Sequence, residues 1–335
     1  MTRRDRAGWR MMRRLGQPGM PRASASNIPL GLASGRMKRA RLNTLLLSTG
    51  IAAGVGVAWL ATEWVRLRRI PALSPESKRN GIRGEYLNAG PYRIFSRVTG
   101  DAEPHVVLLH GLVISSRYME PLALALSRDF RVHAPDLPGF GESRTRRTAL
   151  SIRELADALH LWLKASGIER ASFVGNSFGC QILTDFAMRY PHAVDRLVLQ
   201  GPTVDRRARH LLTQILRDRR NGRLEQARSA ASIGRIDYAK AGLIRAFSTM
   251  RALIDDRIED RLLYVEAPTL VVAGTRDPVA PLDWAREVAE RLPHGALLAI
   301  DGGTHTLNYV YPYSFALAIR PFLRGGQSID EARRS

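Results

Sequence analysis

Short apolar segments rich in β-branched residues alternate with longer helical segments along most of the chain after residue 91. This alternation is typical of a mostly parallel β-sheet with helices packed on both faces, so the sequence predicts an α/β fold. The expected strands are residues 92–98, 106–109, 132–134, 172–174, 197–200, 270–273 and 297–300, and the expected helices are residues 116–127, 152–166, 178–189, 282–291 and 313–323.

Residues 202–262 interrupt this alternation with about sixty residues of Arg-rich helical sequence. Connections between neighbouring elements of a compact fold are usually only a few residues long. We therefore expect a helical cap over residues 202–262, inserted into a core formed by residues 92–201 and 263–325. Residues 326–335 are expected to form a tail.

The pentapeptide GNSFG, from Gly175 to Gly179, lies where an expected strand runs into an expected helix. This strand–turn–helix context indicates a nucleophile elbow, in which the two glycines permit a tight turn and Ser177 is held in a strained conformation with its hydroxyl exposed. The alternative is a turn serine that merely caps the helix.

Two further residues follow expected strands in the order required of a catalytic triad. Asp277 comes after the strand LVVAG, and His305 comes after the next strand, in DGGTHTLNY. Both side chains would lie at the carboxyl edge of the sheet, beside Ser177. The three residues together predict a nucleophile, an orienting acid and a general base. Asp205 is the alternative orienting acid.

The turn His110–Gly111 directly follows another expected strand. With this turn, DLPGFGES, GNSFG, GTRDP and GGTH, the sequence resembles the α/β-hydrolase superfamily over residues 91–325. The resemblance implies that the backbone amides of Leu112 and Phe178 form an oxyanion hole. It also implies a structural role for four motif residues: His110, Gly111, Gly175 and Gly179.

Metals and organic cofactors are not expected. No histidine pair has metal-ligand spacing with a carboxylate, and the single cysteine, Cys180, excludes a thiolate zinc site. A Gly-x-Gly-x-x-Gly dinucleotide motif is also missing from the sequence. Cys180 is expected to pack in the first turn of its helix.

These residues predict a serine hydrolase that cleaves a moderately apolar ester, like a carboxylesterase or lipase, through an acyl-enzyme on Ser177. The elbow is also similar to that of C–C bond hydrolases of aromatic ring cleavage, although those commonly have Trp where Thr306 stands. Cofactor-free perhydrolysis is a further alternative. The non-enzymatic alternative is an inactive hydrolase fold used as a binding module.

The formal charge of +20 is unevenly distributed, because residues 1–41 carry eleven basic residues and one acid. No zinc-finger, RNA-recognition or basic-zipper pattern accompanies the charge, so nucleic-acid binding is not expected.

Residues 42–62 contain no charged side chain. A helix of 21 residues reaches about 31 Å, which is enough to cross a bilayer. We therefore expect a transmembrane or signal-anchor helix over residues 42–65, followed by a linker over residues 66–91. The basic segment 1–41 places the hydrolase domain on the non-cytoplasmic side. Cleavage of a signal peptide after Ala58, with release of the protein, is the alternative.

Overall fold

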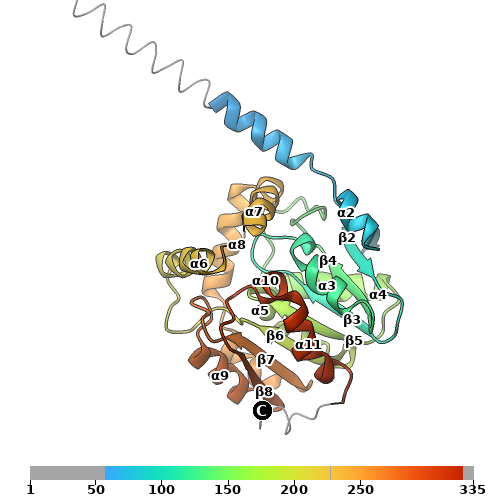
Figure 1. Ribbon diagram of the computed structural model, residues 1–335, viewed down its shortest axis with the longest axis vertical. Coiled ribbons are helices and arrows are strands. Elements are labelled where there is room, and N and C mark those ends of the chain that lie inside the picture. The colour runs from blue at the N-terminus through green and yellow to red at the C-terminus, as the bar shows by residue number, and fades with distance from the viewer. Residues whose placement is uncertain (1–56, 227, 327–335) are drawn as a thin grey trace, which may run out of the picture. The chain divides into compact units, whose positions relative to one another are not determined.

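The computed structural model describes residues 57–226 and 228–326 of the 335-residue chain. An eight-stranded sheet forms its centre, in the spatial order β1-β2-β4-β3-β5-β6-β7-β8 (Figure 1). The pairs β1–β2 and β2–β4 are antiparallel, and all other neighbouring pairs are parallel. The predicted mostly parallel sheet is therefore confirmed.

All seven expected strands are present. They are β2 (Tyr92–Thr99), β3 (His105–Leu109), β4 (Arg131–Pro135), β5 (Ala171–Asn176), β6 (Val194–Gln200), β7 (Thr269–Gly274) and β8 (Gly295–Ile300).

Successive side chains of the central strands point to opposite faces, and each face has its own apolar core. Val107 and Leu109 of β3 belong to the core under helices α4 (Ile152–Ala165), α5 (Phe178–Arg189) and α9 (Leu282–Arg291). Val106 and Leu108 belong to the core under α3 (Glu120–Leu126) and α11 (Pro312–Leu323). Because both faces are covered, the strands read as continuous apolar runs.

The expected linker over residues 66–91 is wrong in its second half. It contains the short helix α2 (Pro75–Arg79) and strand β1 (Arg83–Ala89), which pairs with β2 along its whole length. Most side chains of β1 are exposed and polar, so the segment lacks the apolar run that identified the other strands. Backbone pairing at the sheet edge forms this strand instead.

The segment expected as one helix over residues 116–127 begins with a 3₁₀ turn, η1 (Ser116–Met119), before α3. Pro121 explains the break, because proline fits the first turn of an α-helix and cannot stand in its interior. A capping box formed by Ser151 and Glu154 begins α4.

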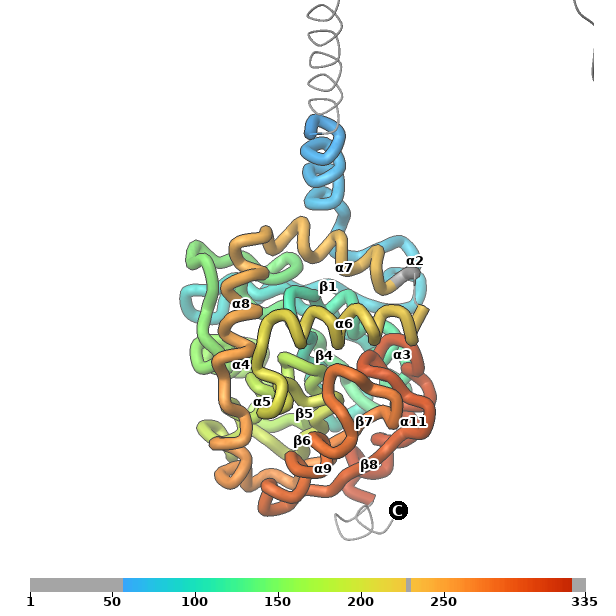
Figure 2. The backbone as a smooth tube through the Cα atoms, turned by 90° about the vertical axis from the view of Figure 1, so that its left-hand side faces the viewer, coloured from blue at the N-terminus to red at the C-terminus, as the bar shows by residue number. Residues whose placement is uncertain are grey.

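The described part of residues 202–262 forms three helices and two 3₁₀ turns. These are α6 (Leu211–Glu225), α7 (Arg228–Ala241), α8 (Leu243–Asp255), η3 (Ile258–Asp260) and η4 (Leu262–Tyr264). Figure 2 shows α6 and α7 running across the same side of the body, with α8 returning from α7 toward the sheet. The structure also contains one short 3₁₀ turn, η2 (Pro191–Ala193), and one short helix, α10 (Leu307–Val310), and residues 57–68 are helical.

The first fifteen residues of the expected membrane span, 42–56, lie outside the described residues, as does the basic segment 1–41. Within residues 57–226 and 228–326, no helix is long and apolar enough to cross a membrane.

Candidate active site

Ser177 occupies the sharp turn between β5 and α5, with φ 55° and ψ −115°. This left-handed conformation is strained for a residue with a side chain. The surrounding glycines permit it: a Cβ at Gly175 would lie 2.8 Å from Leu183 Cδ1, and one at Gly179 would lie 2.7 Å from the Leu109 carbonyl oxygen. The predicted elbow is therefore present as a geometry, and the close backbone contact at Gly179 requires glycine there.

His305 and Asp277 meet at the carboxyl edge of the sheet, as the sequence predicts. His305 Nδ1 lies 2.8 Å from Asp277 Oδ2, and both side chains are buried. The second carboxylate oxygen, Oδ1, accepts hydrogen bonds from the backbone amides of Val279 at 2.7 Å and Ala280 at 3.0 Å. These two bonds orient Asp277 toward the imidazole. Because Asp277 occupies Nδ1, the ring nitrogen of His305 that is available for chemistry is Nε2.

The pKa of His305 is raised above its ordinary value. Burial of the ring lowers the pKa, but the charge and hydrogen bond of Asp277 outweigh that effect, and the charges of Glu225 and Asp218 add to the rise. The site thus favours the imidazolium ion that forms when His305 accepts a proton.

A pair of amides behind the triad holds the loop that carries His305. Gln200 Nε2 donates to the His305 carbonyl oxygen at 2.6 Å, and Asn176 Nδ2 donates to Gln200 Oε1 at 2.7 Å. From the cap, Asn221 Oδ1 accepts a hydrogen bond from the His305 amide at 3.1 Å. Sequence reasoning missed all three residues, although Asn176 stands inside the elbow and Gln200 ends a predicted strand.

Leu112 lines the same cavity as Ser177 and His305, and Phe178 directly follows Ser177 at the start of α5. Neither backbone amide donates a hydrogen bond to any other described part of the chain. The first amides of a helix have no partner within the helix, so the Phe178 amide is free to bind an anion. Both positions fit the expected oxyanion hole.

His110 is buried and serves the loop rather than the reaction. Its Nε2 accepts a hydrogen bond from the Leu137 amide at 3.1 Å, so the proton lies on Nδ1, which donates to the Gly111 carbonyl oxygen at 2.9 Å. Burial lowers the pKa of His110, consistent with this neutral tautomer.

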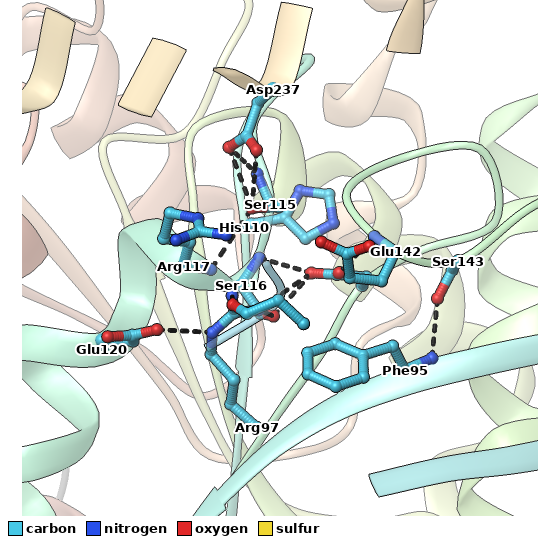
Figure 3. Close-up of polar contacts among 12 residues, drawn as sticks. Phe95, Arg97, His110, Ser115, Ser116, Arg117, Glu120, Glu142, Ser143 and Asp237 are labelled. Atoms are coloured by element: carbon cyan, nitrogen blue, oxygen red, sulfur yellow. Dashed lines mark hydrogen bonds and ion pairs between the residues drawn. The ribbon is translucent and has the colours of Figure 1, made fainter. Parts of the chain in front are cut away.

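The loop after β3 is also held from two sides by carboxylates (Figure 3). From the cap helix α7, Asp237 Oδ2 accepts from the Ser115 amide at 2.8 Å and from Ser115 Oγ at 2.9 Å. From the core, Asp136 Oδ1 accepts from the Ser116 amide at 2.7 Å and from Ser116 Oγ at 2.5 Å. These bonds hold Val113 at φ 56°, a strained value for a β-branched residue. Asp237 therefore links the cap to the loop that carries Leu112.

A cavity of about 360 Å³ opens in front of Ser177 and His305. Core and cap both line it, and each of the three cap helices contributes lining residues. Its lining residues include Leu112, Ile114, Tyr118, Asp218, Glu225, Tyr238, Met250, Leu253 and Val279.

The remaining candidates have structural partners. Asp205, the alternative orienting acid, lies 3.1 Å from Arg217 Nη2, and no contact joins it to His305 in the described residues. Cys180 is fully buried and burial raises its pKa, so it packs as expected. Within residues 57–226 and 228–326, no group of three or more His, Cys, Asp or Glu side chains is arranged to hold a metal ion.

Comparisons with known proteins agree with this architecture. A family model described as alpha/beta hydrolase fold matches residues 104–232, and one described as TAP-like protein matches residues 254–331. A protein of Caulobacter sp. (strain K31) named "Putative carbamate hydrolase RutD" is 27% identical over 243 residues, which cover 66% of this chain and 90% of the relative.

Two solved structures are also similar. One is a membrane phospholipase A described as a bacterial virulence factor, with TM-score 0.64 and 23% identity, covering 86% of this chain and 99% of that chain. The other is a serine hydrolase involved in carbazole degradation, with TM-score 0.62 and 22% identity, covering 73% of this chain and 99% of that chain. At these identities the likeness shows the fold alone. Fold, family models and hydrolase-named relatives together show that the chain is a hydrolase of the α/β-hydrolase superfamily.

Proposed function

We propose that the protein hydrolyses carboxylic esters through an acyl-enzyme on Ser177. The observation that carries this proposal is the pairing of His305 Nδ1 with Asp277, in a cavity that also exposes a serine in a strained elbow. In this arrangement Nε2 of His305 takes the proton from Ser177 Oγ as the oxygen attacks the ester carbonyl carbon.

The site can stabilise the charges that develop during the attack. The amides of Leu112 and Phe178 would donate to the oxyanion, and Asp277 stabilises the imidazolium. The imidazolium then gives its proton to the leaving alcohol. A water molecule, deprotonated by His305, hydrolyses the acyl-enzyme and restores Ser177.

The cavity supports a substrate of moderate size with an apolar part. Its apolar lining includes Leu112, Ile114, Met250, Leu253 and Val279. Carbamates share the ester carbonyl, and one similar protein is named as a carbamate hydrolase, so carbamates belong in the same substrate panel.

Labelling with a fluorophosphonate probe tests the proposal, because only an activated serine reacts. We expect the wild-type protein to gain the mass of one probe and Ser177→Ala to gain none. Ser127→Ala is the matched control, since Ser127 Oγ only donates to the Leu124 carbonyl oxygen at a helix end. The proposal fails if a folded Ser177→Ala protein is labelled like the wild type, or keeps more than a few per cent of its activity on p-nitrophenyl esters.

We further propose that residues 42–65 anchor the protein in a membrane with the hydrolase domain on the non-cytoplasmic side. The uncharged stretch 42–62 and the basic segment 1–41 support this proposal. Residues 60–68 are helical, and Leu60 and Val65 expose apolar side chains.

A further inference from the structure

The catalytic cavity has the opposite charge character to the chain as a whole. The chain carries a formal charge of +20, yet the described side chains that line the cavity include two carboxylates, Asp218 and Glu225, and no Lys or Arg. Such a contrast at a substrate site bears on which substrates the site accepts.

Both carboxylates come from one face of the cap helix α6. Asp218, Asn221, Gly222 and Glu225 are spaced by three, four and seven residues, and all four line the cavity. Asn221 binds the His305 amide, and Glu225 Oε1 accepts a hydrogen bond from the Thr306 amide at 2.9 Å. The acidic face of α6 is therefore fixed directly over the loop that carries His305.

Among the described residues, no ion pair neutralises the negative charge of this face. No Lys or Arg among the described residues forms a salt bridge with Asp218 or Glu225. Asp218 is exposed and Glu225 is half-buried. Partial desolvation by the surrounding chain, together with the charge of Glu225, raises the pKa of Asp218, although His305 and Arg219 partly offset the rise. A positively charged neighbour stabilises the ionised form of a carboxylate in such surroundings.

Two tyrosines line the same cavity as the carboxylates. Tyr118 stacks on Tyr309 with ring centroids 4.8 Å apart, and Tyr238 lies on α7. Burial raises the pKa of Tyr238, and the charge of Asp218 adds to the rise. Carboxylates combined with aromatic rings are the chemistry that recognises ammonium groups in proteins.

We propose that this acidic face of α6 makes the hydrolase selective for esters that carry an amine or quaternary ammonium group, and makes it reject esters that carry a carboxylate. This inference rests on the proposed ester hydrolysis at Ser177. A cationic group bound at Asp218 and Glu225 supplies a counter-charge to both carboxylates, whereas an anionic group meets two like charges in a partly enclosed space.

Three esters of the same acid with matched size test the selectivity. They are the choline ester, its uncharged 3,3-dimethylbutyl isostere and the 3-carboxypropyl ester. A second series carries the same three groups on the acyl side, because the charge can lie on either side of the scissile bond. In one of the series we expect kcat/KM for the cationic ester to exceed that for the neutral isostere by about tenfold, and the anionic ester to be at least as far below it.

Asp218→Asn and Glu225→Gln remove the charges while keeping polar groups of the same shape. We expect the double variant to bring the cationic, neutral and anionic esters of the selective series to within about threefold of one another. Asp255→Asn is the matched control, because Asp255 lies at the end of cap helix α8 and forms an exposed pair with Arg251. This control should leave the selectivity unchanged.

Binding to Ser177→Ala separates this inference from the proposed reaction, since it needs no turnover. Titration calorimetry should show tighter binding of the cationic ester than of its neutral isostere, and the double variant should abolish the difference. Equal binding of the two esters, or a preference that survives in the double variant, overturns the selectivity. Failure of fluorophosphonate to label the wild type overturns the acyl-enzyme instead.

Discussion

Gly201 lies against the imidazole of His305. A Cβ at this glycine would stand 3.0 Å from both Cε1 and Nδ1 of His305, and 3.3 Å from Asp277 Oδ2. Gly201 also has φ +59°, a conformation that favours glycine. Gly201, which directly follows β6, therefore determines how closely the chain can approach the histidine and its acid.

We predict that Gly201→Ala displaces the His305–Asp277 pair and lowers kcat by about 10²-fold, because small misplacements of catalytic groups carry large rate penalties. Gly167→Ala is the matched control: Gly167 has a similar φ of +69°, but a Cβ there would meet no atom within 4 Å. Steady-state kinetics should show that only Gly201→Ala loses activity. Backbone strain at positive φ should lower the melting temperature of both variants. Equal rates for the two variants would contradict this role.

The raised pKa of His305 predicts the pH dependence of the reaction. Burial opposes the shift, but Asp277, Glu225 and Asp218 outweigh it. His305 must be neutral to act as base, so kcat/KM should rise with pH through a midpoint above 6.5 and be lost as the pH falls through it. A pH profile measures this midpoint. Asp218→Asn should move it downward, and a midpoint below 6.5 in the wild type would contradict the geometry.

Asp277→Asn should lower kcat by about 10⁴-fold, because the amide cannot hold the imidazole in the required tautomer or stabilise its positive charge. Asp205→Asn is the matched control, since Asp205 pairs with Arg217 instead of His305. Kinetics of the two folded variants checks the assignment. Loss of activity in Asp205→Asn with normal activity in Asp277→Asn would reverse the roles.

Asp237 supports a prediction about the cap. Replacing it with Leu leaves the Ser115 amide and hydroxyl without their buried acceptor, which should lower the melting temperature and loosen the loop that carries Leu112. We expect kcat to fall about tenfold, with KM much less affected. Asp237→Asn keeps an acceptor oxygen and should retain most of the activity. A normal kcat in a folded Asp237→Leu protein would show that the loop needs no support from the cap.

The sheet and the positions of Ser177, Asp277 and His305 in it could be predicted from sequence because their signals are local. Each central strand is a short apolar run, and Ser177, Asp277 and His305 each follow such a run. Strand β1 could not be predicted in this way, since its polar side chains face solvent and the strand is held by backbone pairing with β2.

The supporting residues of the site depend on contacts between distant parts of the chain. Asn221 lies 84 residues from its partner His305, and Asp237 lies 122 residues from Ser115. A single polar residue on a cap helix carries no local pattern that distinguishes a residue facing the site from one facing solvent. The acidic face of α6 was hidden for the same reason within an Arg-rich segment.

The proposed anchor can be tested separately from the chemistry. If residues 42–65 span the membrane, full-length protein should stay in the membrane pellet after carbonate extraction, because its apolar segment is long enough to cross the bilayer. The signal-peptide alternative predicts a released protein that lacks residues up to about Ala58. Full-length protein in the soluble fraction would contradict the anchor.

A shortened protein of residues 66–335 should be soluble and active. This boundary keeps the contacts that residues 70–72 make with the hydrolase body: the carbonyl oxygens of Ile70, Pro71 and Ala72 accept hydrogen bonds from Lys240, Arg117 and Arg97. A protein starting at Ser74 loses all three acceptors and should melt at a lower temperature.

In right-side-out spheroplasts, added protease should degrade the hydrolase domain of the full-length protein, because the basic segment 1–41 retains the N-terminus in the cytoplasm. Protection of the domain would reverse this orientation.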